Sequence, residues 1–133
     1  MSLKIGNKVY LSWDDINILV EDLCNTITSS GAHITSVAGI PRGGLIPAIM
    51  ISHKLNIPYV DRINKDTLVV DDICDTGETL KKSIALYTAT LHYKPTAGFT
   101  PNFYAKEVGS EWIIYPWERK DSQQIQDYLV HRK

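Results

Sequence analysis

One segment of the 133-residue sequence constrains the fold of the chain more than any other. An apolar run at residues 67–70 leads directly into two adjacent carboxylates, Asp71 and Asp72. Residues 75–79, Asp-Thr-Gly-Glu-Thr, then have the composition of a helix start. A buried strand that ends in charged side chains and is followed by a helix is typical of a parallel α/β sheet.

The rest of the sequence repeats this alternation of strands and helices. Ser12 and Asp15 have the spacing of a capping box, and the apolar residues after them recur at helical intervals: Ile16, Leu19, Val20, Leu23 and Ile27. Further helices are predicted at residues 45–55 and 76–87, and the polar tail 121–133 is a helix candidate. Strands are predicted at residues 36–40, 57–60, 67–70, 89–93, 103–108 and 111–114. We therefore expect a single α/β domain over residues 1–133.

The composition argues against nucleic acid and membranes as partners and bears on where the protein works. Fourteen basic and fifteen acidic residues give a net charge of -1, so the sequence has no electrostatic footprint for nucleic acid or for an anionic membrane. The longest apolar runs are too short to span a bilayer, and the first residues lack the apolar core of a signal peptide. Cys24 and Cys74 have no partner spacing for a disulfide framework or a zinc site. These features predict a cytoplasmic protein.

Two loops that follow predicted strands carry the candidate chemistry, because ligands bind at the carboxyl ends of strands in open parallel sheets. The loop at residues 39–44, Gly-Ile-Pro-Arg-Gly-Gly, combines glycines that let the backbone approach an anion with the donor fork of Arg42. In the other loop, Asp71 and Asp72 can bind ribose hydroxyls or a hydrated magnesium ion. The N–H groups and threonine hydroxyls of residues 75–79 can hold a phosphate. The alternative is an acidic strand end followed by a capped helix.

The segments 68–79 and 40–44 resemble two motifs of the type I phosphoribosyltransferases. The first resembles the signature that binds phosphoribosyl pyrophosphate (PRPP), and the second resembles the pyrophosphate loop. Shorter features, in the order found in bacterial xanthine–guanine phosphoribosyltransferases, are Ser-Trp-Asp at residues 12–14, Lys94-Pro95, and Trp-Ile-Ile-Tyr-Pro-Trp at residues 112–117. The resemblance covers about residues 10–118. It implies a parallel sheet flanked by helices, a small C-terminal hood-like segment, and a homodimer or homotetramer.

For PRPP, the resemblance implies that Pro41, Arg42 and Gly43 hold the pyrophosphate, with a cis peptide bond between Pro41 and Arg42. Asp71 and Asp72 would bind the ribose hydroxyls, and Asp72 would bind Mg²⁺. The residues implied for the 5-phosphate are Asp75, Thr76, Gly77, Glu78 and Thr79.

The resemblance implies that Asp75 and Arg42 are the catalytic residues. Of the two, Asp75 would lie near purine N7 and manage its proton. Lys94 would donate to an exocyclic oxygen, which favours a 6-oxopurine over adenine. Trp112 would stack on the base, and the backbone at Ile113 would reach its 2-position. Two alternatives stay open: Lys94 as a solvated surface charge, and Trp112 as a core or subunit contact.

The sequence departs from the family at two places. Relatives close a long flexible loop over PRPP, but here residues 61–66 are only six and reach about 20 Å when extended, enough to return the chain to the next strand. Glu78 stands where xanthine–guanine enzymes have glycine. A carboxylate there is unfavourable if it points at the phosphate and favourable to the helix dipole if it points outward.

The predicted activity is magnesium-dependent transfer of the 5-phosphoribosyl group from PRPP to guanine, xanthine or hypoxanthine in purine salvage. The short 61–66 connection leaves three possibilities for this site: slow turnover with PRPP hydrolysis, a cover formed by a neighbouring subunit or the C-terminal tail, or a non-catalytic sensor of PRPP or nucleotides. A third class, a phosphoryl-accepting receiver domain, also carries paired acids after a strand, but the phosphate-binding sequence at residues 75–79 argues against it.

Overall fold

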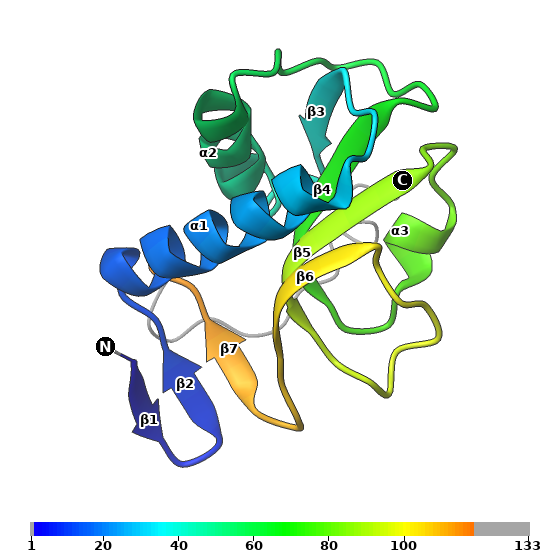
Figure 1. Cartoon of the computed structure of the whole chain (residues 1–133). Coiled ribbons are helices and arrows are strands. Elements are labelled where there is room, and N and C mark those ends of the chain that lie inside the picture. Colours follow the sequence, from blue (N-terminus) through cyan, green and yellow to red (C-terminus); the bar gives the residue numbers. More distant parts are fainter. Residues whose placement is uncertain (1, 119–133) are drawn as a thin grey trace.

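A four-stranded parallel sheet forms the centre of the computed structural model, which describes residues 2–118 (Figure 1). Its strand order is β3-β4-β5-β6, and all three neighbouring pairs are parallel. The strands are β3 (Ser36–Gly39), β4 (Thr67–Cys74), β5 (Tyr87–Tyr93) and β6 (Phe103–Glu107). The predicted parallel α/β sheet is therefore confirmed.

Two helices, α1 (Trp13–Ser30) and α2 (Leu45–Leu55), cover one face of the sheet, and the single turn α3 (Glu78–Lys81) lies on the other (Figure 1). The predicted capping box starts α1: Asp15 N–H donates to Ser12 Oγ at 3.1 Å, and Ser12 N–H donates to Asp15 Oδ2 at 2.8 Å. The helix ends where Gly31 adopts a left-handed conformation, with φ of 72°.

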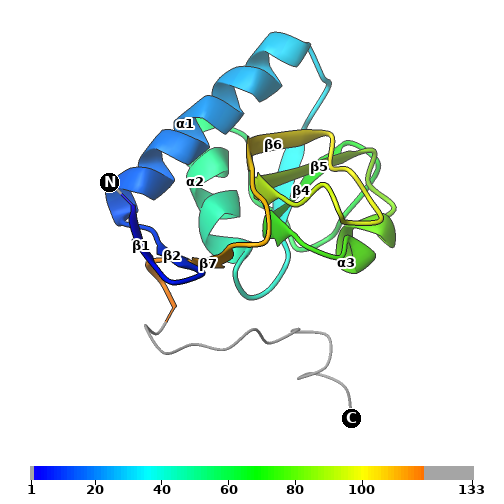
Figure 2. The same cartoon turned by 90° about the horizontal axis from the view of Figure 1, so that it is seen from below.

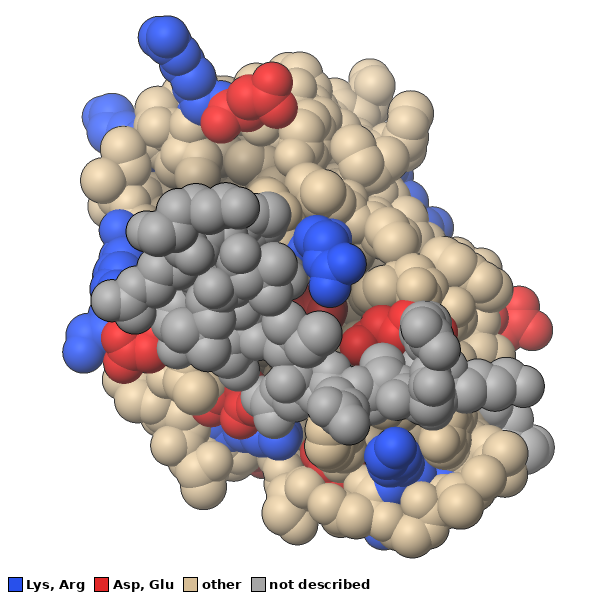
Figure 3. Space-filling view, turned by 180° about the vertical axis from the view of Figure 1, so that it is seen from behind, with Lys and Arg blue, Asp and Glu red and all other residues tan. Residues whose placement is uncertain are grey.

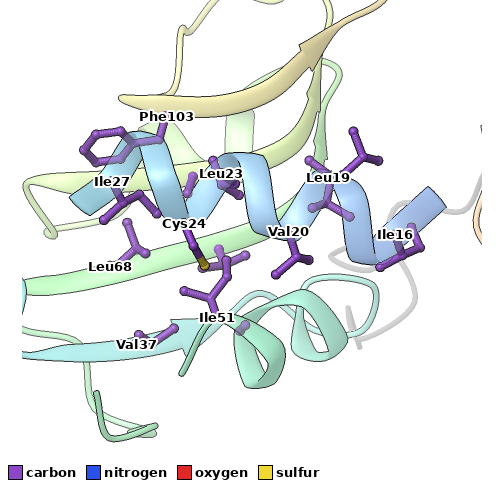
Figure 4. Packing of buried hydrophobic residues seen from close by; sticks show 14 of the residues in the cluster. Ile16, Leu19, Val20, Leu23, Cys24, Ile27, Val37, Ile51, Leu68 and Phe103 are labelled. Carbon is purple, nitrogen blue, oxygen red and sulfur yellow. The ribbon is translucent and has the colours of Figure 1, made fainter. Parts of the chain in front are cut away.

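The main core lies between α1, α2 and the sheet (Figure 4). The stripe of α1 predicted from the helical spacing is buried, and residues of α2, β3, β4 and β6 close around it. Figure 4 labels members of this cluster: Ile16, Leu19, Val20, Leu23, Cys24, Ile27, Val37, Ile51, Leu68 and Phe103. No helix within residues 2–118 is both long and apolar enough to cross a membrane.

A second, small sheet joins the two ends of the described chain. Its order is β1-β2-β7, formed by β1 (Leu3–Ile5), β2 (Lys8–Tyr10) and β7 (Trp112–Ile114). Figures 1 and 2 place it near the start of α1, at one end of the main sheet. The predicted hood-like segment is thus only partly C-terminal, because an N-terminal hairpin builds two of its three strands. The tail at residues 121–133, where a helix was predicted, lies outside the described residues.

Three predicted elements differ in the structure. The strand predicted at 57–60 is reduced to one bridge between Val37 and Tyr59, at the edge of β3. The helix predicted at 76–87 is the single turn α3, since β5 already begins at Tyr87 and the chain needs residues to return to it. The strand predicted at 67–70 continues to Cys74, so both candidate acids lie within β4.

We predict that Leu23→Ala lowers the free energy of unfolding by about 3 kcal/mol, because the side chain is fully buried and its removal leaves a cavity. The matched control is Ile18→Ala on the same helix, where the side chain is 60% exposed and the change should stay within about 0.5 kcal/mol. Urea unfolding of both variants measures the difference. Equal losses would contradict the packing of α1.

Candidate functional site

A cavity of about 450 Å³ opens at the carboxyl end of β4, between the main sheet and the small sheet. It brings together twelve of the thirteen residues predicted for binding: Pro41, Gly43, Asp71, Asp72, Asp75, Thr76, Gly77, Glu78, Thr79, Lys94, Trp112 and Ile113. Arg42 is the exception, since it is exposed and does not line this cavity. The two loops and the base-binding strand predicted from sequence therefore meet at one place.

The acid pair is held by its own backbone. Asp71 Oδ1 accepts a hydrogen bond from Asp72 N–H at 2.8 Å, and Asp72 Oδ1 accepts one from Ile73 N–H at 2.8 Å. Both carboxylates are half-buried on the cavity wall. Backbone bonds of this kind limit the rotation of each carboxylate, so the pair presents its oxygens to the cavity in a restricted set of directions.

The loop before α2 packs closely against these acids. Ile40 N–H donates to the Val70 carbonyl at 2.8 Å, which ties the loop to β4. A side chain on Gly43 would collide with the Asp72 carboxylate, and one on Gly44 would collide with the Val70 carbonyl. Glycine is therefore required at both positions for the loop to lie against the acid pair. The peptide bond between Pro41 and Arg42 is cis, as predicted.

The loop at residues 75–79 forms the neighbouring wall. Gly77 has a φ of 80°, and a side chain there would lie 2.6 Å from Phe99 Cβ. Thr76 Oγ1 accepts a long bond of 3.3 Å from Glu78 N–H, and the Thr76 carbonyl accepts one of 3.3 Å from Gly98 N–H. Glu78 is exposed in the first turn of α3 but still lines the cavity.

Lys94 and Asp75 form an ion pair at the edge of the cavity. The distance from Lys94 Nζ to Asp75 Oδ1 is 3.6 Å, and their side chains are 18% and 28% exposed. Lys94 is held in place because its N–H donates to the Cys74 carbonyl at 3.0 Å. The two residues that the resemblance assigned to N7 and to the exocyclic oxygen are therefore neighbours.

The predicted base platform comes from β7. Trp112 is half-buried, and Lys8 Nζ lies 5.5 Å from the centre of its ring. Ile113 is buried and pairs with Val9 of β2. The small sheet thus fixes both residues on the side of the cavity opposite the main sheet.

The connection at residues 61–66 is as short as the sequence predicted, and none of these described residues lines the cavity. The Asp66 carbonyl accepts from Thr35 N–H at 3.0 Å, and the Lys65 carbonyl accepts from Leu86 N–H at 3.2 Å. These bonds tie the connection to the neighbouring loops, away from the carboxyl end of β4.

The donor set of the cavity fits magnesium brought in with a substrate better than a resident metal. Within residues 2–118, no three His, Cys, Asp or Glu side chains are grouped to hold a metal ion. Mg²⁺ keeps several waters and is commonly held by one or two carboxylates together with substrate phosphates. Asp71 and Asp72 supply two such carboxylates.

Sequence reasoning missed the cavity residues Asn7, Ser110, Tyr115 and Glu118. Asn7 comes from the β1–β2 turn, where its Nδ2 donates to the Ser110 carbonyl at 3.1 Å. Tyr115 is fully buried beside Asp72, and burial raises the pKa of its hydroxyl well above the usual value, so it remains protonated. Only the position of Tyr115 directly after the predicted base platform could have drawn attention to it.

Cys74, which follows the acid pair at the end of β4, is buried at 1% exposure. Burial, followed by the charges of Asp71 and Asp75, raises the pKa of its thiol to about 11. The thiol is therefore protonated at neutral pH and is a poor nucleophile. It donates to the Phe99 carbonyl at 3.2 Å and serves packing beneath the loop.

Charge is mixed over the surface. Figure 3 shows the face opposite to that of Figure 1, and acidic and basic side chains alternate over the described part of it without a broad patch of one sign. This distribution agrees with the net charge of -1.

No family model matches the sequence. Among curated proteins it is similar to xanthine-guanine phosphoribosyltransferases. The protein of Cereibacter sphaeroides is 29% identical, with 82% of this chain and 86% of the relative covered. The protein of Chromohalobacter salexigens is 28% identical, with 81% and 82% covered.

Solved structures agree in fold. A purine phosphoribosyltransferase from Pyrococcus horikoshii Ot3 superposes with a TM-score of 0.75 at 27% identity, covering 90% of this chain and 99% of that one. A hypothetical protein from Neisseria gonorrhoeae with bound ppGpp gives 0.69 at 25% identity, covering 90% and 93%. The chain thus has the type I phosphoribosyltransferase fold and is similar in sequence to xanthine-guanine phosphoribosyltransferases over most of its length.

Proposed function

We propose that the chain transfers the 5-phosphoribosyl group from PRPP to N9 of guanine, xanthine or hypoxanthine, giving a nucleotide and pyrophosphate in purine salvage. The observation that carries this proposal is the meeting of four features in one cavity: the acid pair of β4, the glycine loop before α2, the loop at residues 75–79, and the pair Lys94–Asp75. The relatives named xanthine-guanine phosphoribosyltransferase support the class of base.

The layout of the cavity accommodates PRPP along the end of β4. The 5-phosphate lies in the loop at residues 75–79, where backbone N–H groups and threonine hydroxyls donate to it. The ribose hydroxyls face Asp71 and Asp72. The pyrophosphate lies by Pro41, Arg42 and Gly43, with the Arg42 guanidinium turning toward it from the exposed position that it occupies here.

The residues act on the reaction by position and charge. Transfer develops positive charge on the ribose as its bond to pyrophosphate breaks, and carboxylates already fixed beside the ribose stabilise that charge. Asp75 accepts the proton at N7 of the base, while Lys94 donates a hydrogen bond to the exocyclic oxygen of the base. Trp112 stacks on the base from the small sheet.

Magnesium would be held by Asp72, assisted by Asp71, together with pyrophosphate oxygens. When bound, it neutralises charge on the leaving pyrophosphate.

A second candidate function is a sensor that binds PRPP or a nucleotide without turnover. Two observations favour it: the connection at residues 61–66 does not reach the cavity, and one structural neighbour carries ppGpp. A loop that closes over an active site excludes water and so protects a reactive sugar from hydrolysis. Because the 61–66 connection is too short to close over the cavity, the site favours binding over productive transfer.

A coupled assay with Mg²⁺, PRPP and each purine base, alongside calorimetry, separates these two functions. Transferase function predicts nucleotide formation with at least one 6-oxopurine and none with adenine. Binding of PRPP or nucleotide by well-folded protein, with no nucleotide formed from any base, would reject the transferase and support the sensor.

Asp72→Asn should weaken magnesium-dependent PRPP binding by at least about tenfold and abolish transfer, because it removes charge where the metal and ribose bind. Calorimetry with Mg²⁺ and PRPP measures the affinity, and circular dichroism checks that the fold persists. Asp61→Asn is the matched control, since it makes the same change at an exposed acid outside the cavity. Unchanged affinity in Asp72→Asn would place the site elsewhere.

Lys94→Ala should impair use of the base more than affinity for PRPP. Loss of a hydrogen bond from a charged donor costs about 1.5–3 kcal/mol, which corresponds to a loss of roughly 10–150-fold in kcat/KM for the base. Steady-state kinetics with each substrate varied in turn measures the difference, with Lys54→Ala, a lysine outside the cavity, as the control. A rise in the KM for PRPP alone would assign Lys94 to the phosphates instead.

A further inference from the structure

A buried hydrogen-bonded chain lies directly behind the acid pair. Tyr115 Oη donates to the Asp72 carbonyl at 3.1 Å, and His92 Nδ1 lies 2.8 Å from the same hydroxyl. Both side chains are 2% exposed. A tyrosine hydroxyl has one proton, and Tyr115 donates it in the hydrogen bond to the Asp72 carbonyl. In this arrangement the hydroxyl oxygen accepts from His92, whose imidazole then carries its proton on Nδ1.

This chain joins three elements that are distant in sequence. Asp72 belongs to β4, His92 to β5, and Tyr115 follows β7 directly. The pairing of Ile73 with His92 in the sheet places the imidazole next to the acid-bearing strand. The Tyr115 hydroxyl is therefore a direct link between the sheet that carries the acids and the strand that carries the base platform.

Tyr115 is itself held on several sides. Its ring stacks on Trp117 with centroids 4.9 Å apart and an interplanar angle of 3°. Its N–H donates to Glu118 Oε1 at 2.9 Å. Burial, with a smaller contribution from Lys106, lowers the pKa of His92 to about 4, so the imidazole is neutral at pH 7. Because the Tyr115 side chain is fixed in this way, its hydrogen bond can hold the Asp72 carbonyl in one position.

We propose that Tyr115, oriented by His92, is a positioning residue that fixes the backbone of Asp72 relative to the base platform at Trp112 and Ile113. This inference rests on the proposed site for magnesium and PRPP. It adds to that site a residue that positions the Asp72 backbone without binding the ligand itself. Two buried polar side chains cost stability unless both are hydrogen-bonded, and here the partner that completes the chain is the carbonyl of the proposed metal ligand. Purely apolar packing would fill this space without that cost.

The test is Tyr115→Phe, which removes only the hydroxyl and keeps the ring on Trp117. We expect calorimetry to show binding of PRPP with Mg²⁺ weakened by about tenfold, as is usual when a group that orients a metal ligand is lost. The KM for PRPP should rise with it. The matched control is Thr90→Val, because Thr90 Oγ1 is a fully buried hydroxyl of β5 without a hydrogen-bond partner in the described part of the chain. This control should bind PRPP as the unmodified protein does.

A second pair of variants separates positioning from stability. The amide of His92→Asn can replace the Nδ1–H donor and should preserve affinity for PRPP, whereas His92→Leu removes the donor and should lose most of what Tyr115→Phe loses. This pair also decides the matter if Tyr115→Phe does not fold. Equal PRPP affinities for His92→Asn and His92→Leu, or an affinity of folded Tyr115→Phe within twofold of the unmodified protein, would overturn the proposal.

The outcome is independent of turnover. If the unmodified protein binds PRPP but makes no nucleotide, the transferase proposal fails while the binding measurements still decide the role of Tyr115. If the unmodified protein does not bind PRPP with Mg²⁺, both proposals are overturned.

Discussion

The close approach of the loop before α2 to β4 is the constraint on which the site depends. Two glycines allow it, because a side chain on Gly43 would occupy the space of the Asp72 carboxylate and one on Gly44 would meet the Val70 carbonyl. The bond from Ile40 N–H to that same carbonyl holds the loop there. Without this contact the loop at residues 39–44 and the acid pair would be separate surface features, and no single cavity would be lined by both.

The small sheet forms a wall of the cavity, which the short 61–66 connection does not reach. It places the β1–β2 turn and β7 along one side of the cavity, so Asn7, Trp112 and Ile113 face the acids from a different layer. In the described part of the chain, this wall is fixed by strand pairing rather than by a loop that closes. The site is therefore built on regular structure, which favours precise placement of a ligand over enclosure of it.

Local signals predicted much of this structure, and non-local contacts account for the rest. The capping box at Ser12, the buried stripe of α1 and the acid pair are all visible over a few residues of sequence. The first two lie where they were predicted, and the acids line the cavity as predicted but lie within β4 rather than after it. The helix predicted at 76–87 was wrong because periodicity says nothing of how early β5 must begin. The link from Tyr115 to Asp72 spans 43 residues and depends on how two sheets meet, which no sequence pattern encodes.

The two halves of the cavity differ in how freely they can respond to a ligand. On the side proposed for the sugar, each acid accepts from the next backbone N–H and Tyr115 bonds the Asp72 carbonyl, so these groups have little freedom to move. On the side proposed for the base, Lys94 and Asp75 lie 3.6 Å apart and both are partly exposed, so water reaches this ion pair and weakens it. In the proposed function, a base that offers an oxygen to Lys94 and a nitrogen to Asp75 therefore competes with an ion pair that water already weakens. For the proposed transferase, this contrast predicts firm placement of the phosphorylated sugar and tolerance of more than one 6-oxopurine.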